Sequence, residues 1–237
     1  MNPALQPNLA QTAPRNTVRS RRPRPALVRS LWAAMSLLLL IAAAIVVRRT
    51  DVLFFASAPA APPQRAALDA TFEPHPLLVM IHIIPGLLFL LLGATQFMPR
   101  LRQRRPRLHR WAGRVAVGSG LVVGTTALVM SPQMAIGGAN EMAATMFFGV
   151  IFLFCLVKAF LSIRARRVVQ HREWMIRAFA IALAIATIRP IMGIFFATSR
   201  LTHLTPHEFF GIAFWLGFSI HLVAAEAWIN YTRARAV

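Results

Sequence analysis

The chain has 237 residues, of which 57% are hydrophobic and only 14% are charged. Ordinary soluble domains carry about 25% charged residues, so this composition excludes a soluble domain and indicates an integral membrane protein. The net charge is +19, from 26 Lys and Arg against 7 Asp and Glu. In a soluble protein such a charge suggests a nucleic-acid partner. Here the arginines cluster in the amino-terminal tail and between apolar blocks, which argues against nucleic acid and favours the lipid bilayer as partner.

The amino-terminal part of the chain contains a polar tail, one apolar block and a long connection. Residues 1–25 have no apolar period and predict a disordered cytoplasmic tail. Residues 27–47 are long and apolar enough to cross the membrane as the first transmembrane helix. A cleaved signal peptide is the alternative, because Ala-Ser-Ala at residues 56–58 resembles a cleavage site. The length of the block and the two arginines that follow it favour an uncleaved helix, with an outer loop at residues 48–75.

Five further apolar blocks predict a membrane core at residues 76–230. The expected spans are residues 76–98, 111–130, 141–163, 174–197 and 207–230, followed by a cytoplasmic tail at residues 231–237. Each span must be a helix, because backbone polar groups need partners in lipid. With six spans, every arginine-rich segment falls on one side of the membrane, which places both termini in the cytoplasm. The predicted fold class is therefore all-α, a polytopic membrane bundle of six transmembrane helices.

Two polar side chains lie deep in the outer half of these spans. Counting the helical rise from each cytoplasmic boundary places both His82 and Arg189 about 24 Å up their helices. An arginine at that depth costs at least about 2.5 kcal/mol to insert, so it needs polar partners inside the bundle. The available partners are His82, Glu141 and a loop histidine, either His203 or His207. We therefore expect a ligand-binding cavity or a structural polar network around Arg189.

Lys158 and Glu226 lie nearer the cytoplasmic side, about 6–9 Å from their span boundaries. They predict an ion pair if the fourth and sixth spans touch. The alternative is that Lys158 extends its long side chain to the inner surface.

Two backbone signals accompany these polar residues. Gly120 and Gly124 have the small-residue spacing of a close helix-packing surface on the third span. Pro190 follows Arg189 directly, and a kink there would free a carbonyl oxygen near the arginine.

Two histidines open the third and fifth spans in matching surroundings. His109 and His171 are each followed, within six residues, by two arginines and one tryptophan. Two neutral imidazoles from different helices can hold haem iron from both faces, and arginines bind carboxylates such as haem propionates. The pattern predicts a haem b site with His109 and His171 as iron ligands and His82 as a further candidate. The arginines expected around the propionates are Arg107, Arg110, Arg114, Arg172 and Arg177.

These patterns leave three functions open. The first is a membrane electron carrier linked to haem b or quinone. The second is a non-enzymatic protein that binds or transports a small ligand or lipid, with a cavity around Arg189 and His82. The third is anchoring alone, in which the arginines together with Trp111 and Trp174 fix the helices at the membrane surface. The sequence contains no phosphate loop, nucleophile elbow or zinc-spaced His/Cys cluster, and it leaves open whether the protein is an enzyme.

Several of these residues also occur in a characteristic order between about His75 and Trp228. They are His82, Gln96-Phe97, Leu108-His109-Arg110-x-x-Gly113-Arg114, His171-Arg172-x-Trp174-Met175-Ile176-Arg177, Arg189 and Glu226. In this order the chain resembles the bacterial predicted-membrane-protein family called domain of unknown function 2306. The resemblance implies a helical fold in the bacterial inner membrane and a shared residue set, but no reaction. His221 stands where the family has asparagine, so the resemblance gives it no family-wide role. The bundle is also loosely similar to the four-helix cytochrome b561 architecture, an analogy of fold only.

Overall fold

The structure is a computed structural model that describes residues 24–55 and 63–233. The described residues form eight helices: α1 Pro25–Phe54, α2 Pro63–Ala70, α3 Pro76–Gln96, α4 Pro99–Arg104, α5 Pro106–Met134, α6 Gly138–Arg164, α7 Val168–Thr202 and α8 Pro206–Thr232. All except the short α2 and α4 are long and apolar enough to cross a membrane, which makes six candidate spans in this part of the chain. The prediction of an all-α bundle with six transmembrane helices is confirmed. The predicted tail up to residue 23, the Ala-Ser-Ala stretch at 56–58 and residues 234–237 lie outside the described residues.

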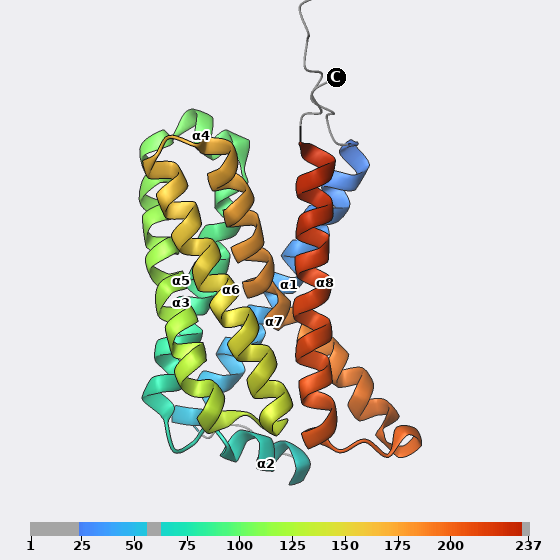
Figure 1. The fold of residues 1–237 in the computed structure, drawn as a ribbon. Helices are drawn as coiled ribbons and strands as arrows, with labels where there is room; N and C mark the ends of the chain where they lie inside the picture. The colour runs from blue at the N-terminus through green and yellow to red at the C-terminus, as the bar shows by residue number, and fades with distance from the viewer. Residues whose placement is uncertain (1–23, 56–62, 234–237) are drawn as a thin grey trace, which may run out of the picture.

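Four helices, α3, α5, α6 and α7, form the central bundle (Figure 1). α3 and α6 each pack against both α5 and α7, so α5 and α7 are diagonally opposite. α8 lies outside this bundle against α7 and α6, and α1 crosses behind it against α3 and α7. α7 therefore contacts α1, α3, α6 and α8, and it is the most buried of the six spans.

Aromatic rings fill the interior of the central bundle. Phe89 of α3 is only 1% exposed. Its ring meets that of Phe152 of α6 edge-on, with centroids 5.4 Å apart, and lies 6.4 Å from that of Phe179 of α7. Phe97, just after α3, packs edge-on against Phe179 at 5.2 Å. These rings connect α3, α6 and α7. The fourth helix of the bundle, α5, packs against its neighbours through glycine residues.

Gly120 and Gly124 let α5 lie close to its neighbours. A Cβ atom at Gly120 would lie 2.8 Å from Leu156 and 3.0 Å from the ring of Phe89, and one at Gly124 would lie 2.5 Å from Leu153. All three distances are shorter than van der Waals contact, so only glycine fits without movement of these side chains. The close-packing surface predicted on the third span is confirmed.

The outside of the bundle is apolar along its length. Exposed large side chains recur every three or four residues, so they form one stripe on each helix. On α3 the stripe is Leu77, Ile81, Ile84, Leu88 and Leu91, and on α6 it is Phe147, Val150, Phe154, Val157 and Leu161. Such continuous apolar stripes on the surface are what lipid-facing helices require.

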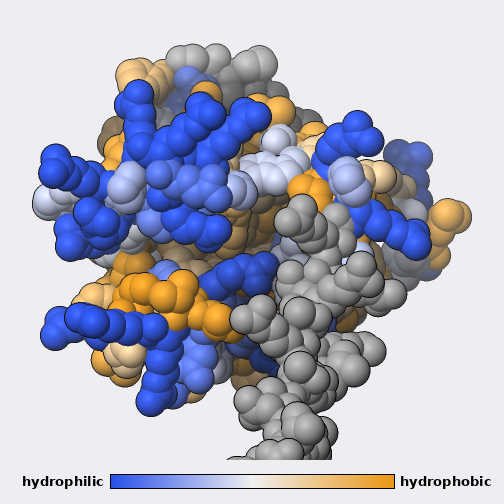
Figure 2. All heavy atoms as spheres, turned by 90° about the horizontal axis from the view of Figure 1, so that it is seen from above, coloured by the Kyte–Doolittle hydropathy of each residue, from blue (hydrophilic) through white to orange (hydrophobic). Residues whose placement is uncertain are grey.

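One end of the molecule is strongly basic. We call it the basic end; it consists of α4, the start of α5, the turn between α6 and α7, and the end of α8. Figure 2 views this end and shows hydrophilic side chains crowded over it. Its exposed arginines are Arg100, Arg102, Arg104, Arg105, Arg107, Arg110, Arg164, Arg166, Arg167 and Arg172. The start of α1 and the end of α8 both lie at this end (Figure 1). The positive-inside rule predicts that the basic end faces the cytoplasm, and that orientation stays a prediction.

The helices continue beyond the predicted spans. α7 runs over 35 residues, where residues 174–197 were expected to cross the membrane, because a helix need not end where the hydrocarbon ends. α1 continues through Arg48 and Arg49 to Phe54, and α2 follows. Most of the described residues in the stretch predicted as an outer loop, 48–75, are therefore helical. We call this opposite end of the bundle the α2 end.

Candidate functional site

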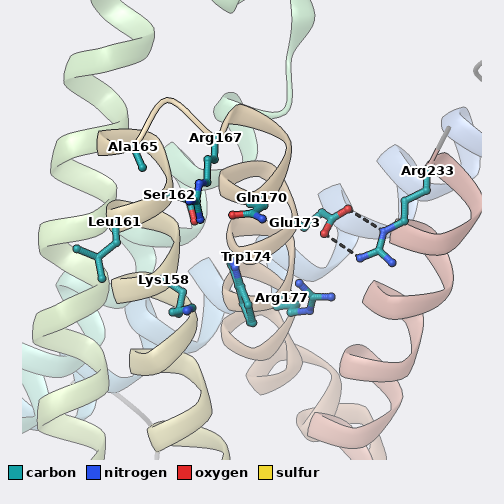
Figure 3. A pocket seen from close by; sticks show the side chains of 10 residues that line it. All are labelled: Lys158, Leu161, Ser162, Ala165, Arg167, Gln170, Glu173, Trp174, Arg177 and Arg233. Carbon is teal, nitrogen blue, oxygen red and sulfur yellow. Dashed lines mark hydrogen bonds and ion pairs between the residues drawn. The ribbon is translucent and has the colours of Figure 1, made fainter.

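An open pocket of about 500 Å³ lies at the basic end, between the end of α6, the start of α7 and the residue that follows α8 (Figure 3). Its walls carry four positive side chains and one negative side chain. The lining residues are Lys158, Leu161, Ser162, Ala165, Arg167, Gln170, Glu173, Trp174, Arg177 and Arg233. The turn between α6 and α7 borders the pocket and passes through Arg166, which has the left-handed conformation with φ of 60°. The backbone N–H of Arg167 then donates to the carbonyl of Ser162 at 2.8 Å, which holds the turn closed.

A bidentate ion pair joins α7 to α8 beside this pocket. The Arg177 guanidinium donates from Nε to Glu226 Oε1, and from Nη2 to Oε2 at 2.9 Å. Trp174 stacks under the same guanidinium, 4.6 Å from it. The predicted ion pair between Lys158 and Glu226 does not form. The Glu226 carboxylate binds Arg177 of the neighbouring helix α7 instead. Lys158 is exposed and lies 5.8 Å from the ring of Phe154.

A second bidentate ion pair joins α7 to Arg233, the residue that follows α8. Arg233 donates from Nε and Nη2 to the two oxygens of Glu173, each at 2.9 Å (Figure 3). The hydrogen bond from Arg233 to the Glu173 carboxylate raises the pKa of this arginine above its ordinary value. Arg172 donates to the hydroxyl of Thr232 at 3.4 Å. Arg172 and Arg177, expected to bind haem propionates, thus both contact α8.

Two positive side chains of the pocket have no such partner. Lys158 and Arg167 form no ion pair with any carboxylate of residues 24–55 and 63–233. The other two cations, Arg177 and Arg233, are each neutralised by one carboxylate. The pocket therefore has a surplus of two positive charges, which suits an anion.

The two histidines of the haem prediction both lie at the basic end. His171 Nδ1–H donates to the carbonyl of Ala159 in α6 at 2.9 Å, because a carbonyl oxygen can only accept. His109 has a buried Nδ1 without a hydrogen-bond partner among the described residues. His171, Arg102 and Arg110 all lie close enough for their charges to act on His109. The structure thus brings the two histidines into one region, although their helices are diagonal rather than adjacent.

Side chains of α3 pack against α5 and α7 near this end of the bundle. The rings of Phe97 and Phe179 are in contact between α3 and α7. Gln96 also fills this region, since its Oε1 lies 3.1 Å from the position a Cβ would take on Gly113. The pocket described above includes neither histidine. The haem site at His109 and His171 stays a prediction.

The remaining arginines of the haem prediction are at the surface. Arg110 is exposed, and Arg114 lies 5.2 Å from the ring of Trp111. Trp111 is itself largely exposed. This arrangement resembles an ordinary anchor at the membrane surface.

At the α2 end, Arg189 lies on the protein surface rather than in an enclosed cavity. The charged groups that act on it are Arg49, Glu141 and Arg48. The buried carboxylate of Glu141 accepts from the backbone N–H of Gly137 at 2.6 Å. Glu141 and two arginines of α1, which the sequence places in a loop, are therefore the charged groups that act electrostatically on Arg189.

His82 does not join this group. Its Nδ1 lies 2.9 Å from the hydroxyl of Thr126 in α5. His221, which matched no other histidine in height, pairs through Nε2 with the Thr187 hydroxyl of α7 at 2.7 Å. His82 and Arg189 thus have different hydrogen-bond partners, and a cavity shared by the two stays a prediction.

Sequence reasoning missed most of the pocket. Arg167, Gln170, Glu173 and Arg233 were not singled out, although Glu173 was a detectable signal as the one acid in a long basic segment. Asp69, which pairs with the arginines of α1, lay in the predicted loop.

Comparison with known proteins gives the family. Residues 79–229 match the family described as predicted membrane protein (DUF2306). The chain belongs to the DUF2306 family. No curated protein and no solved structure matches it, so the likeness to cytochrome b561 stays a prediction. The DUF2306 segment runs from α3 to α8 and contains every pocket residue except Arg233, whereas α1 and α2 lie outside it.

Proposed function

We propose that this multi-pass membrane protein is a non-enzymatic lipid-binding protein that holds an anionic headgroup in the pocket at its basic end. The observation that carries the proposal is the surplus charge of Lys158 and Arg167 in a pocket of about 500 Å³. Small-ligand sites typically have volumes of about 300–1,000 Å³. A phosphate group placed between these two side chains would neutralise charge that no described carboxylate balances.

The surroundings of the pocket favour a lipid over a soluble anion. Leu161 lines the pocket and also belongs to the exposed apolar stripe of α6. Acyl chains of a bound lipid can therefore follow Phe154 and Val157 along the same stripe into the membrane. Trp174 lies in the pocket wall, and tryptophan prefers the level of the lipid headgroups. Lysine and arginine near a membrane surface each attract anionic lipid by about 1 kcal/mol.

The proposal predicts that replacing Lys158 and Arg167 together by glutamine weakens the binding of anionic lipid about tenfold or more. The probe is dihexanoylphosphatidylglycerol, titrated into the purified protein in neutral detergent while the melting temperature is recorded. Dihexanoylphosphatidylcholine, which has no net charge, should stabilise the protein much less. Added salt should weaken the difference, because exposed charges are screened.

The matched control removes two charges from the same end outside the pocket, at Arg100 and Arg104 of α4. This variant should bind the lipid almost as tightly as the unchanged protein. If the two double variants lose affinity equally, the attraction is a general effect of the basic end and the pocket has no special role.

The electron-carrier hypothesis is the second candidate, and one observation favours it. His109 presents a buried nitrogen without a described hydrogen-bond partner, and the ring of the nearby His171 is oriented by Ala159. A bound haem b would supply electron transfer, and a quinone would be its natural partner. Against this hypothesis, neither histidine lines the pocket described above.

We accordingly expect the purified protein, produced with ample haem supply, to show no haem absorption in a reduced-minus-oxidised spectrum. A Soret band and an α band that disappear in both His109→Ala and His171→Ala would overturn this expectation. They would make the histidine pair, rather than the pocket, the centre of the function.

A further inference from the structure

A buried serine in the wall of the basic-end pocket has no side-chain hydrogen bond to the described residues. Ser162 of α6 is only 7% exposed, and it lines the pocket. Other helical hydroxyls of the chain donate to a carbonyl one turn earlier, as Ser30 and Thr198 do. The Ser162 hydroxyl makes no such bond within residues 24–55 and 63–233, and it is reached from the pocket. Buried polar side chains nearly always have a partner, so this hydroxyl suits a ligand held in the pocket.

Ser162 lies between the two cations that no described carboxylate neutralises. Lys158 is one turn earlier in α6, which places its Cβ about 5–6 Å from that of Ser162 on the same face of the helix. Arg167 is held beside Ser162 from the other direction, because its backbone N–H donates to the Ser162 carbonyl at 2.8 Å. All three side chains line the same pocket (Figure 3). A single anion beside the Ser162 hydroxyl is therefore within reach of both cations.

The first turn of α7 adds a further donor to this wall. Gln170 is exposed, lines the pocket and makes no side-chain hydrogen bond with the described part of the chain. It lies one turn after Arg167, which immediately precedes α7. The amino-terminal end of a helix itself favours anions, because its first N–H groups have no partner in the helix. The wall thus combines two positive charges with two neutral hydrogen-bonding side chains.

We infer that the lipid headgroup is a phosphomonoester, held by Lys158 and Arg167 with Ser162 as a hydrogen-bond donor. This inference rests on the lipid-binding function proposed above and names the class of its ligand. A phosphomonoester carries a charge of about −1.5 to −2 at neutral pH and has three acceptor oxygens, which match the two surplus cations and the Ser162 hydroxyl. A phosphodiester headgroup, such as that of phosphatidylglycerol, has a single negative charge and two unsubstituted oxygens. Phosphatidic acid is the simplest lipid of the preferred class.

The test compares dihexanoylphosphatidic acid with dihexanoylphosphatidylglycerol, using the full chain in neutral detergent. Both lipids are titrated at about pH 8, where the phosphomonoester is almost fully charged because its second pKa is about 6, with the melting temperature as readout. The unchanged protein should bind phosphatidic acid about tenfold more tightly, the gain expected for one more charge-assisted contact. Equal affinity for the two lipids overturns the phosphomonoester assignment, whereas the lipid pocket itself stands.

Ser162→Ala isolates the hydroxyl. It should lower the affinity for phosphatidic acid about tenfold, because a hydrogen bond to a charged group is lost, and change the affinity for phosphatidylglycerol much less. The matched control is Ser131→Ala: Ser131 of α5 is 6% exposed, and its hydroxyl donates to the carbonyl of Met142 outside the pocket. This control should keep the full preference for phosphatidic acid. An undiminished preference in Ser162→Ala overturns the inference.

Two further measurements complete the test. If Ser162→Ala does not fold, Gln170→Leu removes the other neutral donor from an exposed position, and an undiminished preference there is equally contrary. Glycerol phosphate carries the same phosphomonoester without acyl chains. Much weaker binding of glycerol phosphate supports a lipid, whereas binding as tight as that of phosphatidic acid overturns the lipid assignment and keeps the phosphomonoester. Failure of both lipids to bind overturns the proposed function together with this inference.

Discussion

Replacing Glu226 by alanine will lower the free energy of unfolding by about 2 kcal/mol. The Arg177 guanidinium loses both of its hydrogen bonds to this carboxylate and stays only 14% exposed between α7 and α8. Removing one partner of a fully buried pair typically costs about 3–5 kcal/mol. The lower figure applies because the Glu226 side chain is 41% exposed. The measurement is reversible unfolding in mixed micelles, followed by tryptophan fluorescence.

The chain provides a matched control for this variant. Glu173→Ala breaks a second bidentate pair between the same helices, but its partner Arg233 is exposed. Exposed pairs contribute little, so Glu173→Ala should be much milder. Adding Arg177→Met to Glu226→Ala should recover part of the loss, since no unpaired charge remains. Equal losses in the two single variants would contradict the burial argument.

Phe89→Ala will be at least as destabilising, at about 3 kcal/mol. Its ring touches Phe152 and rests on Gly120 of α5, so its removal leaves a cavity where three helices meet. In a membrane the loss is mainly of packing contacts, because lipid is as apolar as the side chain itself. The same unfolding measurement detects it.

Phe160→Ala is the control for Phe89→Ala. Phe160 is 48% exposed on α6, so lipid replaces most of the lost contacts and the change should be small. Phe89→Leu should lie between the two, because leucine refills part of the cavity. A loss at Phe160 as large as that at Phe89 would mean that the central bundle is not packed around Phe89.

The pocket at the basic end shows which features the sequence predicts and which it does not. The region was predicted, because His171 and the arginines around it mark the basic end of α7. The chemistry predicted for this region, a haem site, differs from the ion pairs that the structure shows there. Arg172 and Arg177 were expected to face a haem between α5 and α7, but they contact Thr232 and Glu226 of α8. Helix contacts decide which side of α7 each arginine occupies, and those contacts involve residues about fifty to sixty positions away.

The polar residues at the α2 end show that depth in the membrane can be predicted from the sequence, whereas the direction of a side chain cannot. His82 and Arg189 were placed at equal depth by counting residues, and both lie in the halves of their helices that this counting predicts. Counting along a helix measures height but not direction around the axis. His82 therefore meets Thr126 of α5, whereas Arg189 meets charges of α1 and α6.

The sequence by itself determined that this protein is a bundle of six membrane-crossing helices with one strongly basic end. The length of an apolar run and the position of arginines along the chain are local properties, and the thickness of the bilayer turns them directly into spans. Only the tertiary structure decided that Arg177 rather than Lys158 pairs with Glu226, that Phe97 packs against Phe179 between α3 and α7, and that α1 continues as a helix through Arg48 and Arg49. Those outcomes depend on which helices are neighbours and how each is rotated, because side chains interact only over a few ångströms.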